Sequence, residues 1–280
     1  MQGYVYGNLR AILFNCWFNM SPQQFLQLGP VQLEYRQLPG ADPSRPTLVL
    51  LHEGLGSASQ WKDFPLRLAQ TSGYGVVTYS RQGYGQSSPV TLPRPLNYLS
   101  SDGPRELRQL LDALQLPQVV LLGHSDGASI VLAYAATNDP RVLGSIALAP
   151  HVIVETESLD GIRHTTEAWH QGELRERLAR HHGTNVDGAF HGWSDSWLHP
   201  DFSLDDLEAQ LAYIEKPLLV IQGREDHYAT PEQLVVIQRQ VAGPCRCVLL
   251  DNCRHFPQTE ATEQTLQLIC EFLKRLPAFT

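Results

Sequence analysis

Apolar residues in this chain gather in short runs that alternate with segments of helical pattern. Uninterrupted apolar runs of this length are typical of strands that are buried on both faces, as in parallel sheets covered by helices. Strands are predicted at residues 47–51, 75–79, 118–122, 142–149, 217–222 and 245–250, and helices near residues 59–70, 101–115, 128–136 and 258–276. The alternation predicts an α/β fold with a mainly parallel sheet and helices on both of its faces.

The N-terminal region departs from this pattern. Residues 31–38 alternate between apolar and polar, which predicts an edge strand, and residues 1–30 are assigned to an N-terminal arm or extension. The apolar run at residues 11–18 follows a single positive charge, Arg10, and no clear small-residue cleavage site follows it, which disfavours a signal peptide. Whether residues 1–19 pack on the body or extend upstream of it stays open.

A stretch of nearly seventy residues between 149 and 217 breaks the alternation. Helical patterns near 166–182 and 203–213 predict a helical cap over residues 155–213, at the carboxyl edge of the sheet, where open α/β sheets place their sites. The core then comprises residues 31–154 and 214–280. The cap segment is rich in large aromatic and imidazole side chains, namely Trp169, Trp193, Trp197, His164, His170, His181, His182, His191 and His199.

Composition narrows the class of protein. With 280 residues, 42% hydrophobic and 18% charged, the chain matches an ordinary globular protein. A net charge of −8 argues against nucleic acid as a main partner. No apolar run approaches the ~20 residues that span a bilayer, so no membrane partner is expected.

Cysteine and histidine usage indicates neither a disulfide framework nor a metal site. The five cysteines are odd in number, and Cys245 and Cys247 are predicted to lie on the same face of one strand, which indicates reduced thiols in a cytoplasm. The cap histidines show neither a His-Glu-x-x-His motif nor a Cys/His ligand spacing, so we interpret them as solvated surface residues. We expect no metal and no cofactor.

A glycine–serine motif follows the strand at 118–122. Gly123, Ser125 and Gly127 have the G-x-S-x-G spacing of a nucleophile elbow between a strand and a helix. Such a turn holds the serine in a strained conformation with its hydroxyl exposed, and side chains at the two glycines would collide with the neighbouring strand and helix. A plain strand-to-helix turn is the alternative explanation of the motif, so an acid and a base are needed to decide.

Both partners occur in the order that this architecture requires, the acid first and then the base. Asp226 follows the strand at 217–222, and His255 follows the last strand, although each by itself is also compatible with a charged or solvated loop. In this interpretation His255 removes the proton of Ser125, while Asp226 holds the imidazole in the required tautomer and stabilises the imidazolium. Glu225 is the alternative acid.

Oxyanion donors are expected from two backbone positions. One is the N–H of Asp126, at the start of the helix after the elbow, and the other lies in the loop at residues 52–56. Gly54 is favoured in that loop, and Leu55 is the second choice.

Four side chains are assigned to substrate binding: Glu53, Asp126, Trp193 and Trp197. If the two carboxylates face the pocket, they disfavour a substrate carboxylate and favour neutral or amine-bearing esters. The alternative for Asp126 is stabilisation by the helix N-terminus, and for Glu53 a structural hydrogen bond or a salt bridge to Arg81. For the tryptophans the alternative is packing within the cap.

From about residue 31 onward the chain resembles the α/β-hydrolase superfamily. The resemblance rests on the loop at 52–56, the elbow, the acid and base loops, and a further segment containing Arg81, Gly83, Gly85 and Ser87. It is most similar to small capped serine esterases and biphenyl-hydrolase-like serine hydrolases, whose elbows can also carry aspartate after the serine. The serine nucleophile distinguishes it from epoxide hydrolases and haloalkane dehalogenases, which use aspartate.

Two residues depart from related patterns. The chain is also similar to carbon–carbon hydrolases of ring-cleavage products, which usually place tryptophan after the catalytic histidine, where this chain has Phe256. Glu53 stands where the oxyanion loop usually has glycine, so the resemblance does not by itself decide whether Gly54 or Leu55 supplies the second oxyanion donor.

The resemblance implies a serine hydrolase that cleaves a small carboxylic ester through an acyl-enzyme on Ser125. An alternative with the same triad is a carbon–carbon bond or lactone hydrolase. A third reading is a non-catalytic ligand-binding protein of the same fold, against which the complete set of Ser125, Asp226 and His255 argues. The expected partner is a small-molecule substrate, and the oligomeric state is left open.

Overall fold

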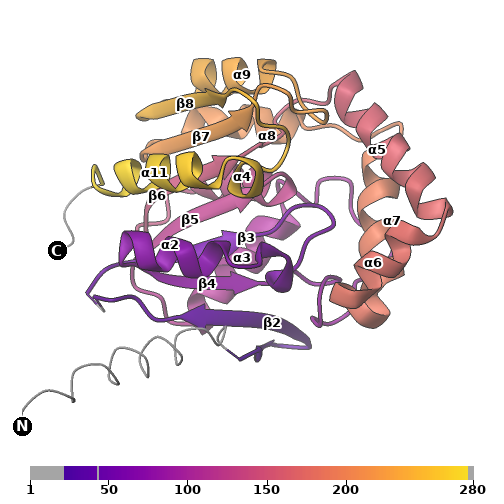
Figure 1. The fold of residues 1–280 in the computed structure, drawn as a ribbon, viewed down its shortest axis with the longest axis horizontal. Coiled ribbons are helices and arrows are strands. Elements are labelled where there is room, and N and C mark those ends of the chain that lie inside the picture. Colours follow the sequence, from indigo (N-terminus) through magenta and orange to yellow (C-terminus); the bar gives the residue numbers. More distant parts are fainter. Residues whose placement is uncertain (1–21, 43, 277–280) are drawn as a thin grey trace, which may run out of the picture.

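The computed structural model describes residues 22–42 and 44–276. At its centre lies an eight-stranded sheet with the spatial order β1-β2-β4-β3-β5-β6-β7-β8 (Figure 1). The strands are β1 (Gln24–Leu28), β2 (Val31–Leu38), β3 (Thr47–Leu51), β4 (Gly75–Tyr79), β5 (Val119–His124), β6 (Val142–Leu148), β7 (Leu218–Gly223) and β8 (Cys245–Leu250). Strands β3 to β8 are parallel, whereas β1 and β2 pair antiparallel with their neighbours, so the prediction of a mainly parallel sheet is confirmed.

The N-terminal edge differs from the prediction. Residues 31–38 form β2, but they are not the edge, because β1 pairs antiparallel with them and places Gln24 opposite Tyr35. Assigning all of residues 1–30 to an arm is therefore wrong for β1. This strand is only five residues long and its exposed face carries Phe25, so its pattern does not stand out from the sequence. The rest of the predicted arm, residues 1–21, lies outside the described residues.

Helices cover both faces of the sheet, as predicted. Along β3 the side chains alternate, so that Val49 and Leu51 join one apolar cluster and Leu48 and Leu50 join the other. The first cluster is completed by α3 (Asp102–Ala113) and α4 (Asp126–Ala135), and the second by α2 (Phe64–Ser72) and α11 (Thr262–Leu273).

Within the described part of the core there are three further helical elements: η1 (Ala58–Trp61), α9 (Glu232–Gln240) and α10 (Pro257–Glu260). The helix α9 was not predicted. The helix expected at 258–276 is divided into α10 and α11, because Ala261 between them has φ −133° and ψ 47°, which is not helical.

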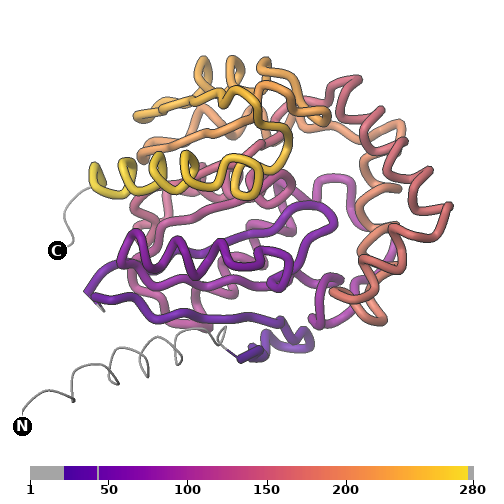
Figure 2. The backbone as a smooth tube through the Cα atoms, in the orientation of Figure 1, coloured from indigo at the N-terminus to yellow at the C-terminus, as the bar shows by residue number. Residues whose placement is uncertain are grey.

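The residues predicted as a cap, 155–213, are called the insertion below. They form α5 (Thr156–His170), α6 (Glu173–His182), η2 (Gly183–Asn185), α7 (Val186–Trp197), α8 (Asp205–Gln210) and η3 (Leu211–Tyr213). Helices α5, α6 and α7 stand together at one end of the sheet, and the backbone path runs out to them from β6 and returns to β7 (Figures 1 and 2). By contrast, α8 packs against α4, and η3 packs against α4 and α9, so this last part of the insertion adjoins the core.

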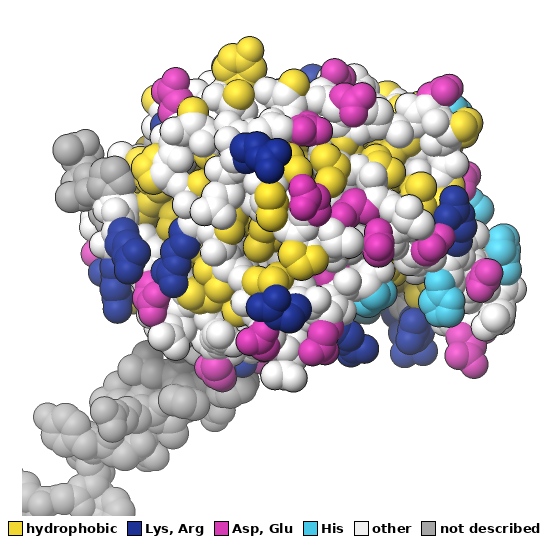
Figure 3. All heavy atoms as spheres, turned by 90° about the horizontal axis from the view of Figure 1, so that it is seen from above, with side chains coloured by type: hydrophobic (Ala, Val, Ile, Leu, Met, Phe, Trp, Pro, Cys, Tyr) yellow, Lys and Arg dark blue, Asp and Glu magenta, His cyan; other side chains and the backbone are white. Residues whose placement is uncertain are grey.

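Several imidazoles of the insertion reach the surface, and Figure 3 shows histidines on this end of the molecule. His164, His170 and His199 are exposed. The surface interpretation is wrong for His182, which is buried. One nitrogen of its ring accepts a hydrogen bond from the Gly85 N–H, and the other donates one to the Leu55 carbonyl. Among residues 22–42 and 44–276, no three ligand-type side chains are grouped so that they could hold a metal.

In the same described part of the chain, no helix combines the length and the apolar character that crossing a bilayer requires.

Candidate active site

The turn between β5 and α4 has the geometry of a nucleophile elbow. Ser125 has φ 53° and ψ −121°, a strained conformation for a residue with a side chain, and its N–H donates to the Leu148 carbonyl at 2.9 Å. A Cβ at Gly123 would lie 2.2 Å from the Gly127 carbonyl oxygen, and a Cβ at Gly127 would lie 2.2 Å from that of Leu51. The two glycines are therefore required by close backbone contacts, as the motif predicts.

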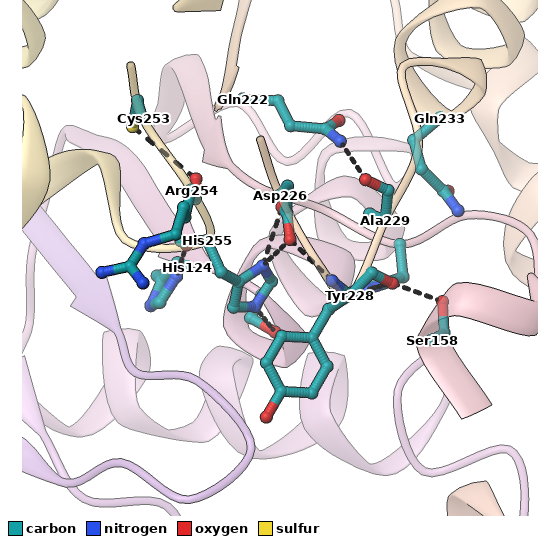
Figure 4. A network of polar contacts seen from close by, with 12 residues as sticks. His124, Ser158, Gln222, Asp226, Tyr228, Ala229, Gln233, Cys253, Arg254 and His255 are labelled. Carbon is teal, nitrogen blue, oxygen red and sulfur yellow. Dashed lines mark hydrogen bonds and ion pairs between the residues drawn. The ribbon is translucent and has the colours of Figure 1, made fainter. Parts of the chain in front are cut away.

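Three residues predicted from separate strand ends meet at this turn. The His255 Nε2 lies 3.0 Å from the Ser125 Oγ. Its Nδ1 lies 2.9 and 2.8 Å from the two carboxylate oxygens of Asp226, and Figure 4 shows His255 and Asp226 facing one another. An ionised carboxylate only accepts, so Nδ1 carries the proton and Nε2 is left to accept the proton of the serine hydroxyl. Glu225, the alternative acid, is exposed, and the carboxylate on His255 is that of Asp226.

The surroundings of this pair set its protonation. Burial lowers the pKa of His255 below its ordinary value, although the charge and hydrogen bond of Asp226 act in the opposite direction. Burial would raise the pKa of Asp226, but the charge and hydrogen bond of His255, together with the Tyr228 N–H and the charge of His151, bring the pKa below its usual value. At neutral pH the site therefore holds a neutral imidazole beside an ionised carboxylate.

The expected oxyanion donors lie beside the serine. The N–H of Asp126 is the first of α4, and first-turn amides have no carbonyl partner within their own helix. Gly54 and Leu55 follow β3 and line the same cavity as Ser125. Which of these two supplies the second donor stays a prediction.

Arg81 holds the loop that carries these residues. Its guanidinium donates to the backbone carbonyls of His52 and Glu53, and its backbone N–H donates to the His52 Nε2 at 3.1 Å. Arg81 therefore fixes the backbone of the loop, and the salt bridge between the Glu53 carboxylate and Arg81 that was one alternative is not formed. The Glu53 carboxylate instead faces His124, with 3.6 Å between its Oε2 and the imidazole Nδ1.

A cavity of about 530 Å³ opens over Ser125. Its walls come from the loops at the strand ends on one side and from α5, α6 and α7 on the other. Trp193 and Trp197 are both part of the wall, and the Trp193 indole lies so close to Gly54 that a Cβ there would be 2.3 Å from its Nε1. Other residues that line the cavity include Glu53, Leu55, Lys62, Asp126, His151, Ile162, Thr165, Arg177, Leu178, Tyr228 and Phe256.

The carboxylate of Asp126 is held inside the protein. Its side chain accepts a hydrogen bond from the Tyr98 hydroxyl at 2.6 Å and another from the Trp197 indole N–H at 3.2 Å, and the residue is 1% exposed. Asp126 thus connects α4 with α7, and its carboxylate stays beside Ser125. Neither Tyr98 nor the tether to Trp197 was predicted, because no sequence pattern links positions 28 and 71 residues apart from Asp126.

Two further residues of the site were missed. His151 lies just after β6, is 3% exposed and lines the cavity, and its Nε2 donates to the Tyr228 carbonyl at 3.2 Å. The ring of Tyr228 lies 4.8 Å from that of His255. Asp226 was identified because it follows the carboxyl end of a predicted parallel strand. His151 also follows the carboxyl end of such a strand, so the same reasoning could have identified it.

Comparison with known proteins places the chain in a family. The model of the alpha/beta hydrolase family matches residues 48–268. A 2-hydroxy-6-oxononadienedioate/2-hydroxy-6-oxononatrienedioate hydrolase from Pseudomonas putida is 28% identical, with 87% of this chain and 92% of that protein covered. A proline iminopeptidase from Lactobacillus helveticus is 24% identical, with 85% and 93% covered.

Among solved structures, the enol-lactonase from Burkholderia xenovorans LB400 has the same fold. Its TM-score is 0.68 at 22% identity, and the match covers 90% of this chain and all of the lactonase chain. The named relatives are hydrolases with different substrates, so they support hydrolysis without selecting the bond that is cleaved.

Proposed function

Because the chain belongs to the alpha/beta hydrolase family, we propose that it is a serine hydrolase that cleaves a small carboxylic ester through an acyl-enzyme on Ser125. The observation that carries the proposal is the hydrogen-bonded series of Ser125, His255 and Asp226 at the floor of the cavity. A protein that only binds a ligand has no need of these three groups in this order.

The geometry defines the steps. His255 accepts the Ser125 proton at Nε2 while Oγ attacks the ester carbonyl carbon, and the oxyanion is stabilised by the N–H of Asp126 and that of Gly54 or Leu55. His255 then returns the proton to the leaving alkoxide as the carbon–oxygen bond breaks. Water, deprotonated by the same imidazole, attacks the acyl-enzyme and releases the acid and free Ser125. Asp226 holds the tautomer throughout and stabilises the imidazolium.

A fluorophosphonate probe tests the nucleophile. The wild-type protein should be labelled on Ser125, and Ser125→Ala should abolish labelling. Ser129→Ala is the matched control, because Ser129 lies one turn further along α4 and its hydroxyl donates to the His151 carbonyl at 2.7 Å. Absence of label on the wild-type protein would favour the non-catalytic ligand-binding alternative.

We assign the choice of acyl group to α5, α6 and α7. The support is that aromatic and aliphatic side chains of these helices, such as Ile162, Trp193 and Trp197, form the wall opposite the strand ends. An apolar wall discriminates by the size and shape of the substrate, since apolar contacts carry little directional information.

A second candidate is hydrolysis of a carbon–carbon bond or a lactone with the same triad. Two observations favour it: the similarity to a hydrolase named for a dienedioate, and the presence of Lys62 and Arg177 among the cavity-lining residues. Both cations are exposed, and within the described part of the chain neither forms an ion pair with a carboxylate. They would suit a carboxylate at the end of the substrate that is distant from Ser125.

A substrate panel separates these candidates. It should contain simple esters, lactones and vinylogous diketones, each with and without a distal carboxylate. If the second candidate holds, diketones with the carboxylate are preferred, and Lys62→Met with Arg177→Met lowers that preference several-fold, while Arg239→Met on α9 leaves it unchanged. Fastest turnover of simple esters, with no effect of the two cations, would support the first.

We further propose a small-molecule substrate in a cytoplasmic setting, with neither nucleic acid nor membrane as a partner. The support for the compartment is that Cys245 and Cys247 lie on the same face of β8 as free thiols, with 3.8 Å between their sulfur atoms.

A further inference from the structure

Tyr228 lies between the acid of the triad and the insertion. Its backbone N–H donates to the Asp226 Oδ1 at 2.9 Å, and the centre of its ring is 4.8 Å from that of His255. Its carbonyl oxygen accepts a hydrogen bond at 2.7 Å from the hydroxyl of Ser158, which belongs to α5. Figure 4 shows Tyr228 between Asp226 and Ser158. One residue thus contacts the acid, the base and the insertion.

The phenol of Tyr228 is bonded to the same helix. Its oxygen lies 2.7 Å from the Thr165 Oγ1, which also lies 2.8 Å from the Gly161 carbonyl oxygen. A carbonyl only accepts and a threonine hydroxyl has one hydrogen, so Thr165 donates to Gly161 and accepts from the Tyr228 O–H. A Cβ at Gly161 would lie 2.6 Å from the Tyr228 Cδ1, so the helix backbone packs directly on the ring. Helix α5 therefore holds both the backbone and the side chain of Tyr228.

The loop that carries Tyr228 is fastened to the insertion at its other end as well. This loop, residues 224–231 between β7 and α9, is called the acid loop below. The Glu155 carboxylate, immediately before α5, accepts from the Thr230 N–H at 3.0 Å and from the side-chain amide of Gln233, at the start of α9, at 2.6 Å. Hydrogen bonds fix direction as well as distance, so the acid loop is oriented by α5 and not only covered by it.

We propose that Tyr228 is a positioning residue through which α5 holds Asp226 in its orientation toward His255. The Asp226 Oδ1 accepts both from the Tyr228 N–H and from the His255 Nδ1, so a displacement of Tyr228 turns the carboxylate relative to the imidazole. The ring of Tyr228 also lines the cavity, so α5 and Tyr228 contribute to the wall and to the triad at once. The effect on turnover rests on the proposed function, whereas the effect on the imidazole does not.

Releasing both bonds from α5 tests this role. Ser158→Ala with Thr165→Val removes the two hydroxyl groups that bond Tyr228 and leaves the triad and Tyr228 itself in place. We expect kcat to fall by about tenfold and KM to change less than about threefold, because the orientation of the acid matters most when the imidazolium forms. Thr166→Val is the matched control and should keep the wild-type kcat, since its hydroxyl donates to the Ile162 carbonyl of its own helix at 2.9 Å. A wild-type kcat in the double variant would overturn the proposal.

A double-mutant cycle separates the hydrogen bond from packing. Tyr228→Phe and Thr165→Val remove the two partners of one bond and nearly conserve volume. Burial raises the pKa of Tyr228, so Tyr228→Phe removes no charge at neutral pH. Each change alone should lower kcat by about threefold and the two together no further, whereas Thr165→Ser keeps the hydroxyl and should stay within about twofold of the wild type. Losses that multiply in the double variant would contradict the proposal.

The ionisation of His255 gives a readout that a purely structural role does not move. The carboxylate of Asp226 favours the protonated imidazole, so turning it away lowers the pKa of His255 further. We expect this pKa, followed by NMR titration of the ring protons, to fall by at least about 0.3 pH unit in Ser158→Ala with Thr165→Val and to stay unchanged in Thr166→Val. The other titratable side chains that face the ring, all retained in these variants, are His124, His151, His227 and Tyr228.

The titration also separates this inference from the proposed function, because it needs neither substrate nor turnover. If the wild-type protein is not labelled on Ser125, the proposed function fails while the titration still decides the role of Tyr228. An unchanged pKa of His255 after both bonds from α5 are removed would refute that role even if Ser125 is labelled.

Discussion

The strand-end loops and the insertion contribute to one cavity in different ways. The loops after β5, β7 and β8 supply Ser125, Asp226 and His255, whose polar atoms lie within 3.0 Å of their partners. The insertion supplies mainly the bulk of the wall, with Trp193 and Trp197 on α7. The hydrogen-bond distances among these three residues depend on backbone positions that the register of the sheet sets. The shape of the cavity wall depends instead on the volume of the side chains that form it. We therefore expect changes in the loops to stop the chemistry and changes in the insertion to redirect it.

The largest effect should follow from removing the nucleophile or the base. Ser125→Ala and His255→Ala should each lower kcat by several orders of magnitude, of the order of 10⁵ to 10⁶, because the groups act as a unit. The double variant should be little worse than either single one in steady-state assays. Losses that multiply in the double variant would show that the two residues act separately.

The pH profile tests the same loops without a mutation. Because the pKa of His255 is lowered by burial and its neutral form is the base, kcat/KM should rise with pH, with its midpoint below the ordinary histidine value, and should be level by pH 8. With a pKa below the ordinary value of about 6.5, the loss at pH 5 is at most about thirtyfold. The background in Ser125→Ala is subtracted. A rate that is level from pH 5 to pH 8 would count against His255 as the base.

A change in the insertion should alter selectivity and spare the triad. Trp193→Ala enlarges the cavity beside Gly54, and we expect the ratio of kcat/KM for long over short acyl esters to change by about tenfold, with Ser125 labelling retained. Trp169→Ala is the control, since Trp169 stacks on Phe190 at 3.9 Å and does not line the cavity. If Trp193→Ala lowers only the melting temperature, as the control should, Trp193 is a packing residue.

The smallest effect is expected at Asp126, where the two regions meet. Its carboxylate is engaged by Tyr98 and Trp197, so the preference for an amine-bearing ester that its charge favours should be a few-fold at most. Comparing an amino-acid ester with its N-acetyl form, in the wild type and in Asp126→Asn, measures it. An unchanged ratio would leave Asp126 as a link between α4 and α7.

The two regions also differed in how far the sequence revealed them. Strands β3 to β8 were found within one or two residues, because uninterrupted apolar runs and turn residues are local signals. In the insertion most of α5 and the whole of α7 were missed, although α7 carries both tryptophans of the wall. Its buried residues face the cavity and other helices at once, and such mixed surroundings leave no clean helical period.

Sequence alone determined the elbow, the order of serine, acid and base, and the α/β class, since each depends on residues that are neighbours in the chain or on one repeated pattern. Only the tertiary structure decided the partners of charged groups. The contacts of Glu53 with His124, of Asp126 with Tyr98 and Trp197, and of His182 with Leu55 join residues from separate elements. A hydrogen bond depends on tenths of an ångström between such elements, and that distance is set when the sheet and its helices pack, not by any local run of residues.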